Sequence, residues 1–316
     1  MSQATETMLS FERTVPCSLA HRRALGEVFV ADTSTDGSEG FLAAIQIPRA
    51  HSLYFDRLVD YHDPLSTVEA IRQAMIVVGH RYLNVPQNTP ASLQQLDFEV
   101  EDLSVFRDTG NAPLEGIVRA HAGMFDSFGD AAGTFFEAQL TIAGSQAMTL
   151  RGSGIQFPAD TYREIRALQQ DNRPGVDAPA EPVQRVAPEQ VGRRDPRNVV
   201  VGTTERGFSL VIDQRHPSFF DHAYDHVPGP LLIEGYRQAA VVAAARAGFL
   251  ASPVAAVLGC EATFSGFAEL GAPVELTAEP EADPDTDGAR VALGVHQFGA
   301  RIAGCRIELA PYPAGA

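Results

Sequence analysis

The sequence predicts an α+β fold made of two copies of one unit, in which an antiparallel sheet wraps around a long central helix. Residues 216–239 (HPSFFDHAYDHVPGPLLIEGYRQA) align without a gap on residues 51–74 (HSLYFDRLVDYHDPLSTVEAIRQA). The same order of strand-like and helix-like segments occurs in both halves, and a segment rich in proline and acidic residues lies between them. Together these three observations predict a tandem repeat.

Each half begins with two short β-rich segments. They read GEVFVADT and FLAAIQIP in the first half, and NVVVGTT and FSLVIDQ in the second. The duplicated segment then leads into a helix, expected at about residues 65–83 and about residues 231–250. The second helix (LLIEGYRQAAVVAAARAGFL) is apolar on nearly all sides, which is typical of a buried helix.

Four strand-like runs follow the helix in each half. They read LDFEVEDLSVF, LEGIVRAHAG, GTFFEAQLTIAG and AMTLRGSGIQF in the first half, and GCEATFSGF, PVELTAEPE, RVALGVHQF and RIAGCRIELA in the second. A long helix followed by an antiparallel meander is the arrangement of the hotdog fold. Because hotdog domains normally act as dimers, we expect a tandem (double) hotdog that forms a pseudo-dimer within one chain.

The composition of residues 169–198 divides the chain. This segment is rich in Pro, Asp, Glu and Gln and has no apolar periodicity, so it is interpreted as an interdomain linker. We therefore expect an N-terminal hotdog domain at 1–168 and a C-terminal hotdog domain at 199–316.

The charged residues exclude several function classes. A net charge of −16 argues against nucleic-acid binding, which needs a basic surface. The chain contains no lysine, so all 24 basic residues are arginine. This excludes Schiff-base, pyridoxal-phosphate and P-loop lysine chemistry, and leaves arginine or backbone amides to hold any anion. The arginine clusters at 21–23 and 192–197 are interpreted as exposed loop charges.

The remaining composition suits a cytoplasmic protein. The N-terminal residues lack an apolar run long enough for a signal peptide, and no span approaches the ~20 apolar residues of a membrane helix. The three cysteines are odd in number and widely spaced, which fits a reducing compartment. We expect no membrane association and no cofactor.

Both copies of the duplicated segment carry the same polar triad. Glu234, Arg237 and Gln238 are spaced i, i+3 and i+4, which places them on one helix face, and Glu69, Arg72 and Gln73 repeat this spacing in the first copy. A buried Glu–Arg pair either fixes a helix to a sheet or serves a function. Both interpretations stay open for the first copy, whereas the surroundings of the second favour function.

Those surroundings form a polar approach to the second helix. Gly229 permits a tight turn, and free backbone N–H groups at the helix start would polarise a thioester or ketone oxygen. Glu234 lies within about a turn of that point, and would act as a general base if its surroundings raise its pKa. His222, Asp225 and His226 precede the helix and suit acid–base work, hydrogen bonding or capping. With no second cluster to complete a site, no metal is expected.

The two copies differ where the helix begins. The first has Tyr61-His-Asp-Pro in place of His226-Val-Pro-Gly and so lacks the proline–glycine turn. We expect unequal halves with one principal site, to which Glu69 and Arg72 either contribute from across the interface or add only structure.

The duplicated segments, together with VGHRYLNVP after the first helix, resemble the A-factor biosynthesis hotdog family, the AfsA-type γ-butyrolactone and butenolide synthases. The resemblance implies an acyltransferase. A β-ketoacyl group moves from an acyl carrier protein or coenzyme A thioester to a hydroxyl of dihydroxyacetone phosphate or a similar C3 acceptor. The product leads to a butenolide signalling molecule that regulates antibiotic production.

The resemblance also implies roles for the triads. Glu234, Arg237 and Glu69 are expected to be catalytic, with Glu234 as base and Arg237 as the cation for the phosphate. The expected substrate-binding residues are His222, Asp225, His226, Gly229, Arg72 and Gln238.

Two rival interpretations stay open. The first is a hotdog thioesterase or dehydratase, although the dehydratase histidine, fourteen residues before the acid, would fall on Phe220. The second, of another class, is a non-catalytic protein that binds acyl or lactone ligands. A homodimer is possible on either interpretation.

Overall fold

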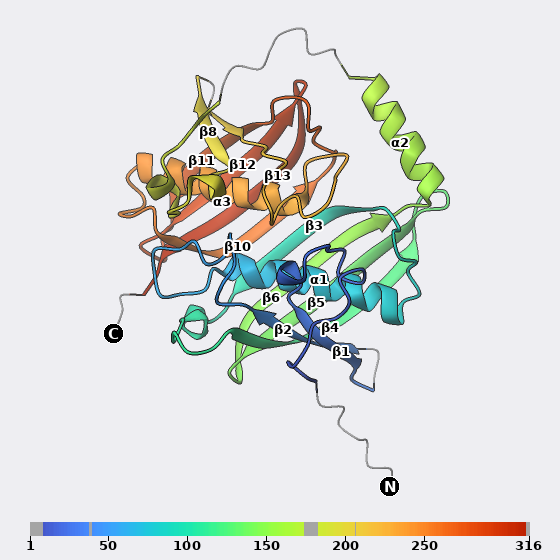
Figure 1. Ribbon diagram of the computed structural model, residues 1–316. Helices are drawn as coiled ribbons and strands as arrows, with labels where there is room; N and C mark the ends of the chain where they lie inside the picture. The colour runs from blue at the N-terminus through green and yellow to red at the C-terminus, as the bar shows by residue number, and fades with distance from the viewer. Residues whose placement is uncertain (1–8, 38–39, 174–182, 206, 314–316) are drawn as a thin grey trace.

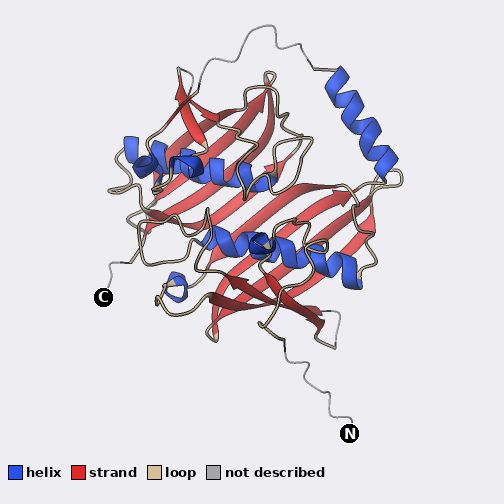
Figure 2. Ribbon diagram, in the orientation of Figure 1, coloured by secondary structure: helices blue, strands red, loops and turns tan. Residues whose placement is uncertain are grey.

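The computed structural model describes residues 9–37, 40–173, 183–205 and 207–313. Two central helices, α1 (Pro64–Tyr82) and α3 (Gly229–Arg246), lie side by side on one face of a single large sheet (Figure 1 and Figure 2). Within the described residues the sheet has thirteen strands, and every neighbouring pair is antiparallel.

The two halves arrange their strands in equivalent orders. The first half runs β1-β2-β4-β5-β6-β3, and the second runs β10-β13-β12-β11-β9-β8-β7. The strands of the first half are β1 (Val30–Thr35), β2 (Gly40–Ile47), β3 (Ala91–Val100), β4 (Leu114–Asp126), β5 (Ala132–Ile142) and β6 (Ser145–Gln156). Those of the second are β7 (Gln184–Arg185), β8 (Val201–Thr204), β9 (Gly207–Leu210), β10 (Ala255–Phe264), β11 (Glu275–Ala282), β12 (Ala289–Gln297) and β13 (Ala300–Pro311).

The halves join through β3 and β10 in the middle of the sheet. These strands pair antiparallel, with Phe98 opposite Cys260. Each hotdog unit therefore contributes one edge strand to a seam, and the two small sheets become one. The structure confirms the predicted tandem hotdog and its intrachain pseudo-dimer.

Helix α3 is a buried helix, as its sequence predicts. Residues 231–244 are all buried, and most of them are small or apolar. The small side chains allow close contact with the sheet. A Cβ at Gly235 would lie 2.6 Å from Cδ1 of Leu210, so a larger residue would push helix and strand apart. Among the helices of the described residues, none is both long and apolar enough to cross a bilayer.

The two central helices begin differently. Helix α1 starts after Asp63, whose carboxylate accepts a hydrogen bond from the N–H of Leu65 (3.0 Å). Helix α3 starts after Pro228, and no side chain caps its first turn. The start of α1 is thus occupied by a carboxylate, whereas that of α3 keeps its positive dipole end uncovered.

The predicted linker at 169–198 contains local structure. Helix α2 (Ala159–Asp171) reaches into it, and residues 174–182 lie outside the described part of the chain. Two short 3-10 helices follow, η3 (Pro188–Val191) and η4 (Pro196–Asn198), and they bury Val191 and Asn198. The later part of this segment therefore packs into the second half. The domain boundaries themselves stay a prediction.

Candidate active site

The predicted polar side chains project from equivalent turns of α1 and α3. Arg237 donates to Glu234 from Nε (2.9 Å) and Nη2 (2.6 Å), and from Nη1 to the carbonyl of Val191 (3.0 Å). Arg72 donates to Glu69 from Nε and Nη2, both at 2.8 Å. Its Nη1 makes no hydrogen bond within the described residues. The two ion pairs have the same geometry, but only Arg72 has a free guanidinium edge.

The glutamine of each triad fixes its helix to the neighbouring backbone. Gln238 donates to Glu234 and to the carbonyl of Asn198 (2.7 Å each), and accepts from the N–H of Val200 (2.8 Å). Gln73 makes the corresponding three hydrogen bonds on α1. Gln238 is fully buried, and both of its N–H donors are used. In this geometry Gln238 joins the helix to the neighbouring backbone, and its contact with substrate stays a prediction.

A second arginine joins each pair from a loop. Arg193 donates to Glu234 from Nε (3.2 Å) and Nη2 (2.9 Å), and from Nη1 to the carbonyls of Leu53 (3.1 Å) and Asp56 (2.9 Å). Arg22 donates from Nη2 to Glu69. Both arginines are buried, so the interpretation of their clusters as exposed loop charges is wrong for these two residues. A buried guanidinium is stable here because a carboxylate neutralises it.

The aspartates that recur in both copies explain how these loops are held. Asp221 accepts hydrogen bonds from the N–H groups of Arg23 (2.5 Å) and Ala24 (2.9 Å). Asp56 does the same for Arg194 (2.8 Å) and residue 195 (3.0 Å). Each half therefore fixes the arginine loop of the other half.

These contacts form two ion-pair clusters that differ in net charge. We name them the α1 cluster (Arg22, Glu69, Arg72) and the α3 cluster (Asp63, Arg193, Glu234, Arg237). Asp63 belongs to the second because Oδ2 lies 3.3 Å from Nη2 of Arg193. In the α1 cluster two guanidinium groups face one carboxylate, leaving one positive charge. In the α3 cluster two face two, so it is neutral. Counted over these members, only the α1 cluster has a net positive charge, and the carboxylate of Glu27 also acts electrostatically on its Arg22.

The surroundings of Glu234 do not raise its pKa. Burial alone would raise it, but Arg193 and Arg237, with hydrogen bonds from Arg237 and Gln238, lower the pKa of Glu234 to about 2. The pKa of Glu69 is lowered in the same way, since its arginine neighbours outweigh burial. Both carboxylates are ionised and bind protons weakly near neutral pH. The condition under which Glu234 would act as a general base is therefore not met.

A cavity of about 350 Å³ lies between the two halves. Apolar side chains from α1, β3 and β5 form part of its wall, including Met75, Ile76, Leu93 and Phe136. Polar groups from both halves form the rest, including His21, Arg72, His80, His222, Tyr224 and Gly229. The arginine of the first half thus lies in the same cavity as the helix start of the second half.

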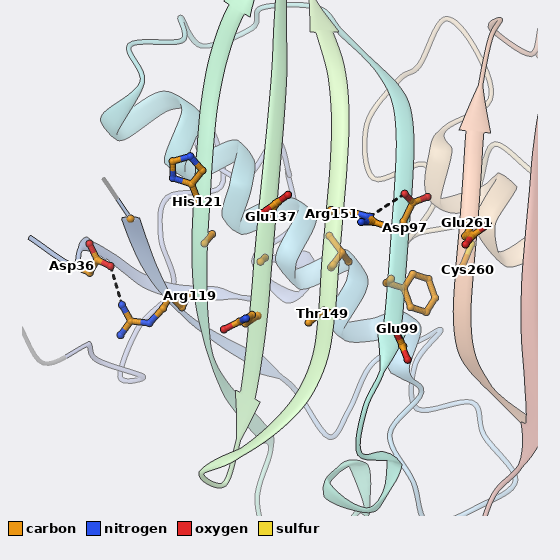
Figure 3. A pocket seen from close by; sticks show the side chains of 16 residues that line it. Asp36, Asp97, Glu99, Arg119, His121, Glu137, Thr149, Arg151, Cys260 and Glu261 are labelled. Carbon is orange, nitrogen blue, oxygen red and sulfur yellow. Dashed lines mark hydrogen bonds and ion pairs between the residues drawn. The ribbon is translucent and has the colours of Figure 1, made fainter. Parts of the chain in front are cut away.

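A larger and more open depression of about 830 Å³ lies on the other face of the sheet, with α1 behind the strands (Figure 3). Its walls carry charged residues that are partly paired with one another, as in Arg119–Asp36 (2.8 Å) and Arg151–Asp97 (3.3 Å). It contains neither a helix start nor any residue of the two clusters. We therefore take the smaller cavity as the candidate active site.

Residues 3–122 and 176–311 match the family model for the A-factor biosynthesis hotdog domain. The chain belongs to this family. It is 31% identical over 301 residues to a Streptomyces virginiae protein named 2-oxo-3-(phosphooxy)propyl 3-oxoalkanoate synthase, covering 93% of this chain and 97% of that one. A Streptomyces griseus protein of the same name is 30% identical, with 91% and 93% covered. Among solved structures, an isomerase-inactive variant of GphF DH1 has a TM-score of 0.52 at 13% identity, over 91% of this chain and 98% of that one, which shows the fold alone.

Four of the predicted site residues of this A-factor biosynthesis hotdog protein line the cavity. They are Arg72, His222, His226 and Gly229. Four others are buried: Glu69, Glu234 and Arg237 belong to the two ion-pair clusters, and Gln238 donates a hydrogen bond to Glu234. Asp225 accepts hydrogen bonds from Tyr162 Oη (3.0 Å) and Arg166 Nε (3.0 Å), and so ties the loop before α3 to α2. The open site therefore combines the first-copy arginine with the second-copy helix start.

The sequence prediction missed Arg22, Arg193, His21 and His80. A signal for the two arginines was present, because Arg193 follows Arg22 by 171 positions. The backbone N–H groups of Phe29 and Val200 donate to the two triad glutamines, and these residues are also 171 positions apart. The repeat thus extends into HRR and GRR, with a six-residue shift relative to the duplicated segment.

Proposed function

We propose that this protein transfers a β-ketoacyl group from a thioester to the hydroxyl of dihydroxyacetone phosphate or a similar C3 acceptor. The names of the relatives describe such an ester, which joins a 2-oxo-3-(phosphooxy)propyl group to a 3-oxoalkanoate. The structural observation that carries the proposal is the cavity between the halves, where an apolar wall meets Arg72, whose guanidinium keeps one edge unpaired among the described residues.

The apolar wall suits the acyl chain, and the start of α3 suits the thioester carbonyl. The N–H groups of Leu231 and Leu232 donate to the carbonyl of Pro228. Pro230 has no N–H, and the N–H of Gly229 has no acceptor within the described residues. Gly229 lines the cavity. One amide and the positive end of the helix dipole are therefore available to stabilise the oxyanion of the tetrahedral intermediate.

The α1 cluster suits the acceptor phosphate. Glu69 holds Arg72 by two parallel hydrogen bonds, so the guanidinium is fixed before substrate binds. Its Nη1 edge is free to donate to a phosphate oxygen. In this proposal Glu69 positions Arg72, while Glu234 and Arg237 stabilise the second half. Direct catalytic roles for Glu69, Glu234 and Arg237 stay predictions, which the geometry does not favour.

The proposal is tested with a β-ketoacyl coenzyme A of medium chain length, with and without dihydroxyacetone phosphate. Free thiol released only with the acceptor, together with formation of the phosphorylated ester, supports a transferase. Release without the acceptor indicates a thioesterase instead. An unchanged thioester that still binds the protein indicates a binding protein. An acyl carrier protein as donor, a homodimer and a cytoplasmic location stay parts of the proposal.

A further inference from the structure

Two histidines in the cavity have no part in the function proposed so far. His21 lies in the loop before η1 (Leu25–Glu27), and His80 lies in the last turn of α1. Their Nε2 atoms are 2.7 Å apart, so one ring donates a hydrogen bond to the other. Both rings line the cavity beside Arg72.

The protonation of this dyad follows from its outer contact. Nδ1 of His80 lies 2.8 Å from the carbonyl oxygen of Val85, which only accepts, so Nδ1 carries the hydrogen. In the neutral ring, Nε2 of His80 is then an acceptor, and Nε2 of His21 must be the donor. This leaves the lone pair of His21 on Nδ1. His80 therefore selects the tautomer in which His21 has a basic nitrogen away from the dyad.

Burial, together with nearby arginines, keeps His21 neutral. Burial, followed by His80, Arg72, His222 and Arg22, lowers the pKa of His21 to about 4. Near neutral pH the ring is unprotonated and able to accept a proton.

The backbone at His21 is strained for a histidine. Its φ is +50°, in the left-handed region that favours glycine. The equivalent residue of the second half, at the 171-residue offset, is Gly192 with a φ of +70°. The loop thus adopts this conformation in both halves, and the histidine stands only in the first half, where its ring lines the cavity. Strain retained at one residue of a cavity indicates a functional role for its side chain.

The second histidine also occurs in the first half only. The residue equivalent to His80, at the 165-residue offset of the central helices, is Ala245. The arginines and glutamates recur in both halves, whereas the histidine dyad is single. The dyad, whose two rings line the cavity, therefore does not repeat with the ion-pair clusters.

We propose that His21 is the general base of the transfer and that His80 positions it. This inference rests on the proposed function. Nδ1 of His21 takes the proton of the acceptor hydroxyl as the oxygen attacks the thioester carbon, forming the C–O bond. When the tetrahedral intermediate collapses, the C–S bond breaks and the imidazolium returns the proton to the departing sulfur. The cycle leaves His21 neutral, with one ester and one free thiol as products.

The deciding variant is His21→Gly, because glycine is the relaxed residue for this φ. The variant is expected to keep the wild-type melting temperature or exceed it. Its kcat should fall about 10²–10⁴-fold, the usual contribution of a general base, while the KM for dihydroxyacetone phosphate changes less than about threefold. Added imidazole should restore part of the rate, since the substitution leaves the space of the ring empty. His21→Asn, which also tolerates the left-handed region, serves as the second variant.

His80 is tested through the pH profile. The wild-type kcat/KM should rise with pH through about 4 and then remain constant. His80→Phe should lower kcat and shift the pH at which kcat/KM rises. His80→Gln, which retains a hydrogen-bond acceptor for His21, should preserve more activity. The matched control is His121→Ala, because His121 lies on the outer face of the sheet (Figure 3). This variant should change neither kcat nor the pH dependence of kcat/KM.

The outcomes separate this inference from the proposed function. If wild-type protein shows acceptor-dependent transfer and His21→Gly keeps its kcat within threefold, the base is another group and the inference is overturned. The same holds if both folded His21 variants lose only affinity for the acceptor. If wild-type protein itself shows no acceptor-dependent transfer, the proposed function fails first.

Discussion

Replacing Arg72 and Arg237 separately tests which ion-pair cluster holds the phosphate. About 25% of the Arg72 side chain is exposed, against 6% for Arg237. A hydrogen bond to a charged group contributes about 1.5–3 kcal/mol, which corresponds to a factor of about 10–150 in affinity. Arg72→Ala should therefore raise the acceptor KM by at least about tenfold. The increase should lie near the lower end of this range because solvent reaches the side chain. Its effect on stability should be small, since Glu69 keeps Arg22 and Gln73.

Arg237→Ala should have the opposite profile. It removes three hydrogen bonds and leaves a buried carboxylate with one arginine fewer, and breaking a buried pair costs about 3–5 kcal/mol. For 316 residues that unfold cooperatively, this lowers the melting temperature by about 5–8 °C, from an unfolding entropy of about 2.1 cal/mol/K per residue. At a temperature where the variant is folded, its acceptor KM should remain close to the wild-type value.

The assay compares dihydroxyacetone phosphate with dihydroxyacetone as acceptors for each variant. The wild type should prefer the phosphorylated acceptor, and Arg72→Ala should remove most of that preference while Arg237→Ala retains it. The electrostatic reasoning is refuted if Arg72→Ala keeps the preference. Loss of the preference in Arg237→Ala, without a change in melting temperature, would instead restore Arg237 as the phosphate ligand.

Three further predictions concern pH, donor length and the loop contacts. The stability contributed by ionised Glu234 should be complete above its unfolded pKa of 4.5 and lost as the pH falls toward about 2. The free energy of unfolding should fall by about 3 kcal/mol over this range, as measured by urea unfolding. Glu234→Gln should reduce this pH dependence. Met75→Trp should narrow the apolar wall and shift kcat/KM toward shorter β-ketoacyl donors, while Arg119→Ala on the outer face leaves the donor series unchanged. Asp221→Ala should lower both kcat and stability because it releases the loop that carries His21, whereas Asp56→Ala, which releases the equivalent loop of the second half, should lower stability only.

Much of the fold could be predicted from the sequence, because the duplicated segment marks the same helix in each half. The seam between β3 and β10 could not, since any exposed edge strand is able to pair with another and local pattern does not select the partner. The glutamates and arginines of the triads were visible through their helical spacing. Which cluster contains a second carboxylate was not visible, because Asp63 and Arg193 are 130 residues apart in the sequence. His21 and His80 are 59 residues apart and meet only in the folded chain.

The exchange of aspartate contacts makes the halves interdependent. A fragment ending after α2 would contain Arg72, His21 and His80, but it would lack Asp221, which restrains the His21 loop, and Gly229, which offers the amide. A fragment beginning after α2 would contain the start of α3 but none of the first-half residues that face it across the cavity. The candidate active site therefore draws on both repeats, and neither fragment alone would contain all of its residues.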